Sequence, residues 1–101
     1  MIVRQWRGWA SPERRDAYPL HFTRNVLPEL RGIDGFLGAE LLAGNEAGRV
    51  EYLVESRWAS IDAIRAFAGE AVENAVVEPE AAAALEDFER VVRHYAVAAS
   101  S

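Results

Sequence analysis

Three side chains of this sequence have types and positions that could do acid–base or anion chemistry. His21 lies in a predicted helix, and its imidazole could act as a base because an unperturbed histidine pKa of ~6.5 is close to working pH. His94 lies in a predicted last strand, which we expect beside the first strand. Arg7, in the first strand, could be a fixed cation that stabilises an anion. We take these three as candidate site residues.

Each of the three also has a purely structural explanation. Arg7 would form a salt bridge with Glu51 or Glu55, because a buried guanidinium needs a partner. His21 would be a partly exposed helix histidine, and His94 a hydrogen-bonded structural histidine or a dimer contact. The sequence alone leaves both explanations open.

Other motifs with chemical meaning are few. Tyr52 and Tyr95 lie in predicted strands and could orient a ligand through their hydroxyl groups, although strand tyrosines more often pack across the sheet. Acidic and histidine residues do not occur at metal-binding spacings, no glycine-rich phosphate loop is present, and no serine has the surroundings of a nucleophile. The acidic residues between Glu78 and Glu89 are expected to be solvated. We therefore expect no metal site.

Composition limits the class of protein and its partners. The 101 residues make one domain, 1–101, whose small core would gain from pairing with a second chain. The net charge is −5 and every basic residue is an arginine, without a basic stripe, which argues against nucleic acid or a membrane as partner. The chain lacks cysteine and an apolar N-terminal run, and its alanine-rich, lysine-free composition is typical of bacteria. We expect a cytoplasmic bacterial protein.

The first half of the chain predicts a strand, a helix and a hairpin. Residues 2–9 are β-branched and aromatic and predict a strand. A helix then begins either at Ser11 with Pro12 or at Asp16. Its apolar side chains recur every four residues: Tyr18, Phe22, Val26 and Leu30. Two strands, 35–44 and 49–58, flank the turn "NEAG".

The second half predicts two helices and a strand. Ser60 caps a helix that runs through Phe67. Pro79 opens an alanine-rich helical run to about Phe88, and residues 91–99 predict the last strand. The order β-α-β-β-α-β predicts an α+β, ferredoxin-like fold with an antiparallel sheet and helices on one face.

Both faces of the first strand carry a tryptophan and an arginine. In a sheet with one solvent-exposed face, apolar and polar side chains alternate along each strand more regularly than they do here. We therefore expect the helix-free face to be covered by the same face of a second copy. We assign Trp6 to this dimer face. Arg7 and Trp9 are assigned to the helix side, with Trp9 at a pocket mouth or in helix packing. Trp58, at the join of a strand and a helix, is predicted to serve packing.

Four segments resemble the antibiotic biosynthesis monooxygenase family of the dimeric α/β-barrel superfamily. They are "RQWRGWASPE" (4–13), "VLPELRGIDGFLGAELL" (26–42), "VEYLVESRWASIDAIRAFAGE" (50–70) and "VVEPEAAAALEDFERVVRHYAV" (76–97). The resemblance implies a homodimer packed through its sheets and a pocket between sheet and helices in each chain. It also implies oxidation of electron-rich phenolic polyketides by dioxygen without metal or flavin.

The resemblance suggests roles for individual residues. "HY" at His94 and Tyr95 belongs to the subgroup pattern, so we expect His94, Arg7 and Tyr95 to be catalytic. The expected substrate-binding residues are Trp9, His21, Phe22, Tyr52 and Phe67. Haem-degrading relatives carry an asparagine, a tryptophan and a histidine where this chain has Arg7, Phe67 and Val77, so their chemistry is not expected.

Two functions of different classes follow from these observations. The first is a cofactor-independent monooxygenase acting on a small aromatic, polyketide-like molecule. The second is a non-catalytic ligand-binding or structural dimer of the same fold. A cavity that functional side chains reach favours the first, and a pocket filled by Phe22, Phe67 and Trp9 favours the second.

Overall fold

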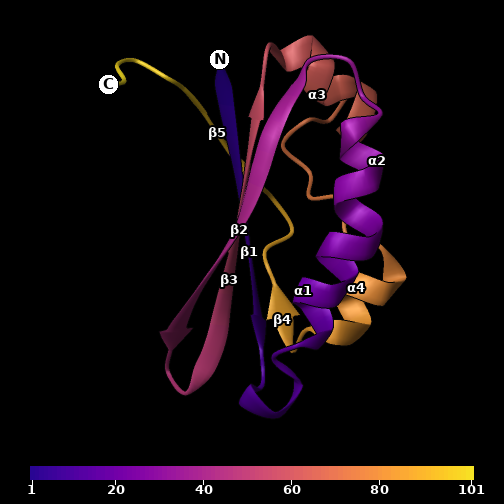
Figure 1. Ribbon diagram of the computed structural model, residues 1–101, viewed down its shortest axis with the longest axis vertical. Coiled ribbons are helices and arrows are strands. Elements are labelled where there is room, and N and C mark those ends of the chain that lie inside the picture. The colour runs from indigo at the N-terminus through magenta and orange to yellow at the C-terminus, as the bar shows by residue number, and fades with distance from the viewer.

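Four helices cover one face of a five-stranded antiparallel sheet in the computed structural model, which describes residues 1–101 (Figure 1). The strands are β1 (Ile2–Ala10), β2 (Phe36–Glu46), β3 (Arg49–Trp58), β4 (Asp87–Phe88) and β5 (Arg93–Ala96). The helices are α1 (Ala17–His21), α2 (Leu27–Arg31), α3 (Ile61–Ala68) and α4 (Pro79–Ala84). The sheet order is β2-β3-β1-β4, and β5 also pairs with β1. The predicted ferredoxin-like α+β fold is confirmed.

The first helix begins at the second of its two predicted starts. Asp16 directly precedes α1, which places Pro19 in the first turn, where its missing N–H leaves no backbone partner unsatisfied. Ser11 instead precedes a short 3₁₀ turn, Pro12–Arg14. The predicted apolar stripe faces the sheet, because Tyr18, Phe22 and Leu30 are buried and Val26 packs against the core.

A π-helical turn, Phe22–Val26, joins α1 to α2 in one continuous helix. The Leu27 N–H bonds to the Phe22 carbonyl five residues earlier. The wide turn makes room for Pro28, whose ring would collide with the carbonyl four residues before it in a regular helix. Side chains at four-residue spacing drift around a regular helix, so the wide turn also keeps the apolar stripe on the sheet.

The predicted hairpin turn and the predicted helix cap in the middle of the chain are both present. Ala47 and Gly48 join β2 to β3 and both have positive φ, as a tight two-residue hairpin requires. The Ser60 hydroxyl accepts from the Ala63 N–H and caps α3. Trp58 is fully buried between Phe36 and Phe67, as a packing residue should be.

The end of the chain differs from its prediction. The helix opened by Pro79 ends at Ala84 rather than near Phe88, because Leu85 is extended and the chain turns back to pair with β1. The N–H groups of Glu86 and Glu89 donate to β1 carbonyls there. β5 spans four residues instead of 91–99, since β1 offers no backbone partner beyond its first residues.

The assignment of β1 side chains to the two faces was wrong. Arg4, Trp6, Gly8 and Ala10 are buried toward the helices, and Arg7 and Trp9 lie on the opposite, helix-free face. Trp6 packs against Tyr18 and Phe88 and donates its Nε1–H to the Glu89 carbonyl. The prediction that β1 side chains alternate between two faces was right, but the two faces were exchanged. Each face carries one tryptophan and one arginine, so the sequence does not show which one turns toward the helices.

Two buried clusters form the core between sheet and helices. The larger gathers around Trp6, Tyr18 and Val50, and the smaller joins Leu30, Trp58 and Ile64. None of the four helices combines the length and the apolar character needed to cross a membrane.

Candidate functional site

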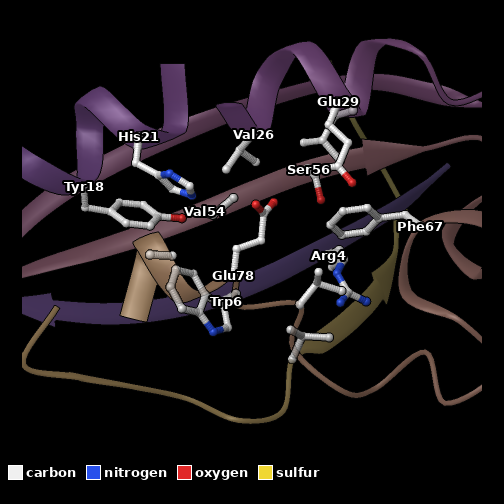
Figure 2. A pocket seen from close by; sticks show the side chains of 14 residues that line it. Arg4, Trp6, Tyr18, His21, Val26, Glu29, Val54, Ser56, Phe67 and Glu78 are labelled. Atoms are coloured by element: carbon white, nitrogen blue, oxygen red, sulfur yellow. The ribbon is translucent and has the colours of Figure 1, made fainter. Parts of the chain in front are cut away.

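A cavity of about 60 Å³ lies between the sheet and the α1–α2 helix (Figure 2). The segment that leads into α4 and the end of α3 close its other sides. Most of the lining is apolar, including Trp6, Val26 and Phe67. Its polar lining residues are Arg4, Tyr18, His21, Glu29, Ser56 and Glu78.

Arg4 brings a buried positive charge to one end of this cavity. It is 5% exposed and takes part in none of the salt bridges of the chain. Its Nη1 donates to the Val72 carbonyl (2.6 Å) and its Nη2 to the Asn74 carbonyl (2.9 Å). Its Nη1 also lies 3.0 Å from His94 Nε2, and its guanidinium stacks over Phe67. Burial lowers the pKa of Arg4 to about 10, so it remains charged near neutral pH.

His94 fixes the position of Arg4 and does not line the cavity. Because a guanidinium can only donate, His94 Nε2 accepts, and the ring proton is on Nδ1. Burial and then the charge of Arg4 lower the pKa of His94, while Glu73 opposes them. His94 is therefore neutral near pH 7.

His21 presents one ring nitrogen to the cavity and the other to its outer side. The residue is 7% exposed, and its Nε2 is buried without a hydrogen-bond partner. Its Nδ1 lies 2.9 Å from Asn25 Nδ2 and 3.4 Å from Glu80 Oε2. The ring can carry its proton on Nδ1, where the N–H would face Glu80, but the contact with the Asn25 amide, which donates, favours Nδ1 as the acceptor and Nε2 as the site of the ring proton. A ligand in the cavity would meet this N–H.

Tyr18 adds a hydroxyl group between His21 and Trp6. Its ring packs against both, and Figure 2 shows the hydroxyl pointing into the space beside Val54 and Glu78. Burial and the negative charge of Glu78 raise its pKa above the ordinary tyrosine value. Tyr18 therefore stays protonated and can donate a hydrogen bond.

Two carboxyl groups line the cavity. Glu29 comes from α2 and Glu78 from the residue before α4. Burial, followed by the charge and hydrogen bond of Glu78, raises the pKa of Glu29.

Only two of the predicted site residues line the cavity. They are His21 and Phe67. Phe22 is buried against Tyr18 in the core. Tyr52 is buried too, and its hydroxyl donates to the Arg15 carbonyl, so it serves to anchor the turn before α1.

The other predicted site residues lie apart from the cavity. Arg7 and Trp9 are on the helix-free face, where Arg7 lies 3.8 Å from Glu51. This contact is the salt bridge with Glu51 that the sequence offered as the structural role of Arg7. The Arg49 guanidinium covers the Trp9 ring. Tyr95 is half exposed and pairs with Val3 on this same face.

Sequence reasoning missed Arg4, Tyr18, Ser56 and Glu78 as cavity residues. Arg4 lies on the same face of β1 as Trp6, so assigning that face to the helix side would have identified Arg4. Tyr18 was recognised only as part of the apolar stripe. Ser56 accepts the Trp58 Nε1–H at 2.8 Å, a contact with no sequence signal. No three histidine or acidic side chains are grouped to hold a metal ion.

Comparisons with known proteins identify the fold and a family. The family model described as "Antibiotic biosynthesis monooxygenase" matches residues 1–78. The structure resembles a crystal structure from Deinococcus radiodurans described as a putative antibiotic biosynthesis monooxygenase, with a TM-score of 0.62 and 14% sequence identity. The match covers 100% of this chain and 96% of that one, and shows a shared fold. No protein of curated function matches the sequence.

Proposed function

Because this chain belongs to the antibiotic biosynthesis monooxygenase family, we propose that it oxidises a small phenolic molecule held in the cavity between sheet and helices. One observation carries the proposal. A buried arginine without a carboxylate partner and a buried histidine nitrogen without any partner face the same apolar cavity. A buried charge without a counter-charge and a buried nitrogen without a hydrogen-bond partner, both at an apolar cavity, are typical of a ligand site.

The charges of the lining favour an acidic hydroxyl group on the ligand. Arg4 would stabilise a phenolate, which supplies the negative charge that its surroundings lack. The Tyr18 hydroxyl and the His21 Nε2–H would donate hydrogen bonds to ligand oxygen atoms. A phenolate is more electron-rich than its phenol, and exclusion of water would protect its reaction with dioxygen.

The oxidation can balance with dioxygen as the oxidant alone. For a phenolic substrate with an activated methylene group, one oxygen atom becomes the new carbonyl oxygen. The second oxygen atom leaves as water with the two methylene hydrogens. The substrate supplies all four electrons, so no further reductant is needed. The chain would contribute binding, the fixed cation and a dry site.

The cavity must enlarge to admit such a substrate. Its volume of about 60 Å³ is below the ~300–1,000 Å³ of typical ligand pockets. Residues 76–78, which follow the carbonyls that hold Arg4, have no regular helix or strand, and Val76 and Glu78 line the cavity. We propose that this segment moves outward when the ligand enters, as cavity-closing segments do in many enzymes.

The small volume also favours a second candidate function. A chain whose cavity never opens would be a structural or ligand-binding dimer without catalysis. The two functions differ in dioxygen consumption with hydroxynaphthalenes and anthrones, measured with a metal chelator and without flavin. Uptake that Arg4→Lys lowers about a hundredfold supports the oxygenase. Binding of these molecules without uptake supports the second function.

A homodimer through the helix-free face is part of this proposal. The face carries exposed Leu42 and Tyr95, together with Leu53 and Trp9. Mixed apolar and charged side chains of this kind suit a two-fold interface. Figure 1 displays this side of the sheet without any covering helix.

A further inference from the structure

His21 is the one residue that lines both the cavity and a groove on the outer surface. The groove lies between α1 and α4, and its polar lining residues are Arg14, His21, Arg24, Asn25 and Glu80. The Nε2 atom of His21 faces the cavity side, and its Nδ1 faces Asn25 and Glu80. A single imidazole therefore lies between the cavity and the outer groove.

Both neutral forms of this imidazole have a partner on the outer side. With the proton on Nε2, the Nδ1 lone pair accepts from the Asn25 amide at 2.9 Å. With the proton on Nδ1, that N–H faces the Glu80 carboxylate at 3.4 Å. Asn25 also donates to Glu80 at 3.0 Å and holds this carboxylate beside the ring. Nδ1 thus has a hydrogen-bond donor at 2.9 Å and a carboxylate within ion-pair distance on the outer side, and the carboxylate is the proton acceptor that a transfer through the ring requires.

We propose that His21 carries the phenolic proton of the bound ligand out of the cavity to Glu80, with Asn25 and Glu80 as positioning residues. The inference rests on the proposed function, which supplies the phenol. In the neutral form with the proton on Nδ1, Nε2 has a free lone pair and accepts the proton as the phenol O–H bond breaks, and the oxygen keeps the electron pair. The Nδ1–H bond then breaks toward the Glu80 carboxylate, which is 76% exposed on its side chain and passes the proton to water. The net change is one phenolate, one proton in solvent and a His21 ring left with its proton on Nε2; exchange with solvent through Glu80 restores the Nδ1–H form.

The surrounding groups are consistent with this direction of transfer. Tyr18 packs against the His21 ring, and burial keeps its hydroxyl protonated, so it does not compete as a base. Glu78 lies on the cavity side, while Arg14 and Arg24 line the groove with Glu80. The negative charge that remains would be stabilised across the cavity by the positive charge of Arg4, which His21 does not contact.

The first test uses the ligand-free protein and the imidazole nitrogens in a long-range proton–nitrogen NMR spectrum. The chain has two histidines, and His94, held with its proton on Nδ1 by Arg4, is the internal reference. We expect His21 to populate both neutral forms in the wild type and only the Nε2–H form in Glu80→Gln. Glu86→Gln removes an exposed carboxylate elsewhere and should change nothing. An identical His21 ratio in wild type and Glu80→Gln would overturn the relay.

The second test measures the transfer itself with 4-nitrophenol, whose absorbance reports its ionisation. After a rapid rise in pH, the bound phenol should ionise about a hundredfold more slowly in His21→Gln than in the wild type. Glu80→Gln should slow it less and leave thermal unfolding unchanged. Equal rates in His21→Gln and wild type would contradict the relay. Failure of 4-nitrophenol to bind counts against the proposed function instead, and the NMR experiment then decides the relay alone.

Discussion

The Nη1 atom of Arg4 lies 3.0 Å from Nε2 of His94, across the pairing of the first and last strands. The contact requires a neutral His94, because a protonated imidazole has no lone pair to offer. It fixes the side chain that places a positive charge at the cavity. The cavity's electrostatics therefore depend on a histidine that does not itself line the cavity.

This dependence predicts that stability falls as pH falls below the ordinary histidine range. The pKa of His94 is lowered in the folded chain. As the pH falls, the unfolded chain therefore binds a proton at His94 before the folded chain does, and this protonation stabilises the unfolded state relative to the folded one. The free energy of unfolding should decrease between the unfolded pKa of ~6.5 and the lower folded value. Urea unfolding at a series of pH values measures it. His94→Gln should lose this part of the pH dependence, and equal slopes would contradict the assignment.

Replacing Arg4 should lower the stability of the folded chain. Arg4→Met leaves the Val72 and Asn74 carbonyls without their donor, which should cost about 2–4 kcal/mol. Arg4→Lys keeps the charge but cannot donate to both carbonyls in the same planar geometry. We expect urea unfolding to rank wild type above Arg4→Lys above Arg4→Met. Equal midpoints would exclude a structural role for the guanidinium.

Filling the cavity should block the ligand and leave the fold intact. Ala81 is buried and lines the cavity from α4, while Ala83 on the same helix is exposed. Ala81→Leu should abolish binding of small phenols in fluorescence or absorbance titrations, at a stability cost of about 1–3 kcal/mol. Ala83→Leu is the matched control and should bind as the wild type does. Unchanged binding by Ala81→Leu would place the ligand elsewhere.

The helix-free face should carry the dimer contact. Leu53 lies on this face of β3, and Leu53→Arg would place a charge in the proposed interface without touching the core. We expect sedimentation to give dimers for the wild type and folded monomers for Leu53→Arg. Trp6→Glu should instead unfold the chain, because Trp6 is buried toward the helices. A dimer unchanged by Leu53→Arg would contradict this surface.

Local patterns predicted the fold well and the site poorly. The hairpin, the Ser60 cap and the four-residue stripe depend on neighbouring residues, and each is present. The cavity depends on which face of β1 turns toward the helices, and both faces carry one tryptophan and one arginine. Nothing local to residues 2–9 decides between them. The packing of Trp6 on Tyr18, from a different element, decides it.

The same limit explains the exchange of roles between residues. The sequence favoured His94 as the catalytic histidine, yet its Nε2 accepts a hydrogen bond from Arg4, which is 90 positions away in the chain. His21 had an ordinary position on a helix, and its exposure depends on α4, which follows it by more than fifty residues. Such long-range contacts leave no periodic signal in the sequence.

The ionisation of bound 4-nitrophenol shows whether the cavity binds a phenol as its anion. If the cavity holds a phenolic ligand as its anion, an absorbance titration should give the bound phenol a lower apparent pKa than the free phenol. Arg4→Lys should shift the value back toward that of the free phenol, because the fixed guanidinium stabilises the anion. A bound phenol that ionises as it does in water, or one that does not bind at all, would contradict the account.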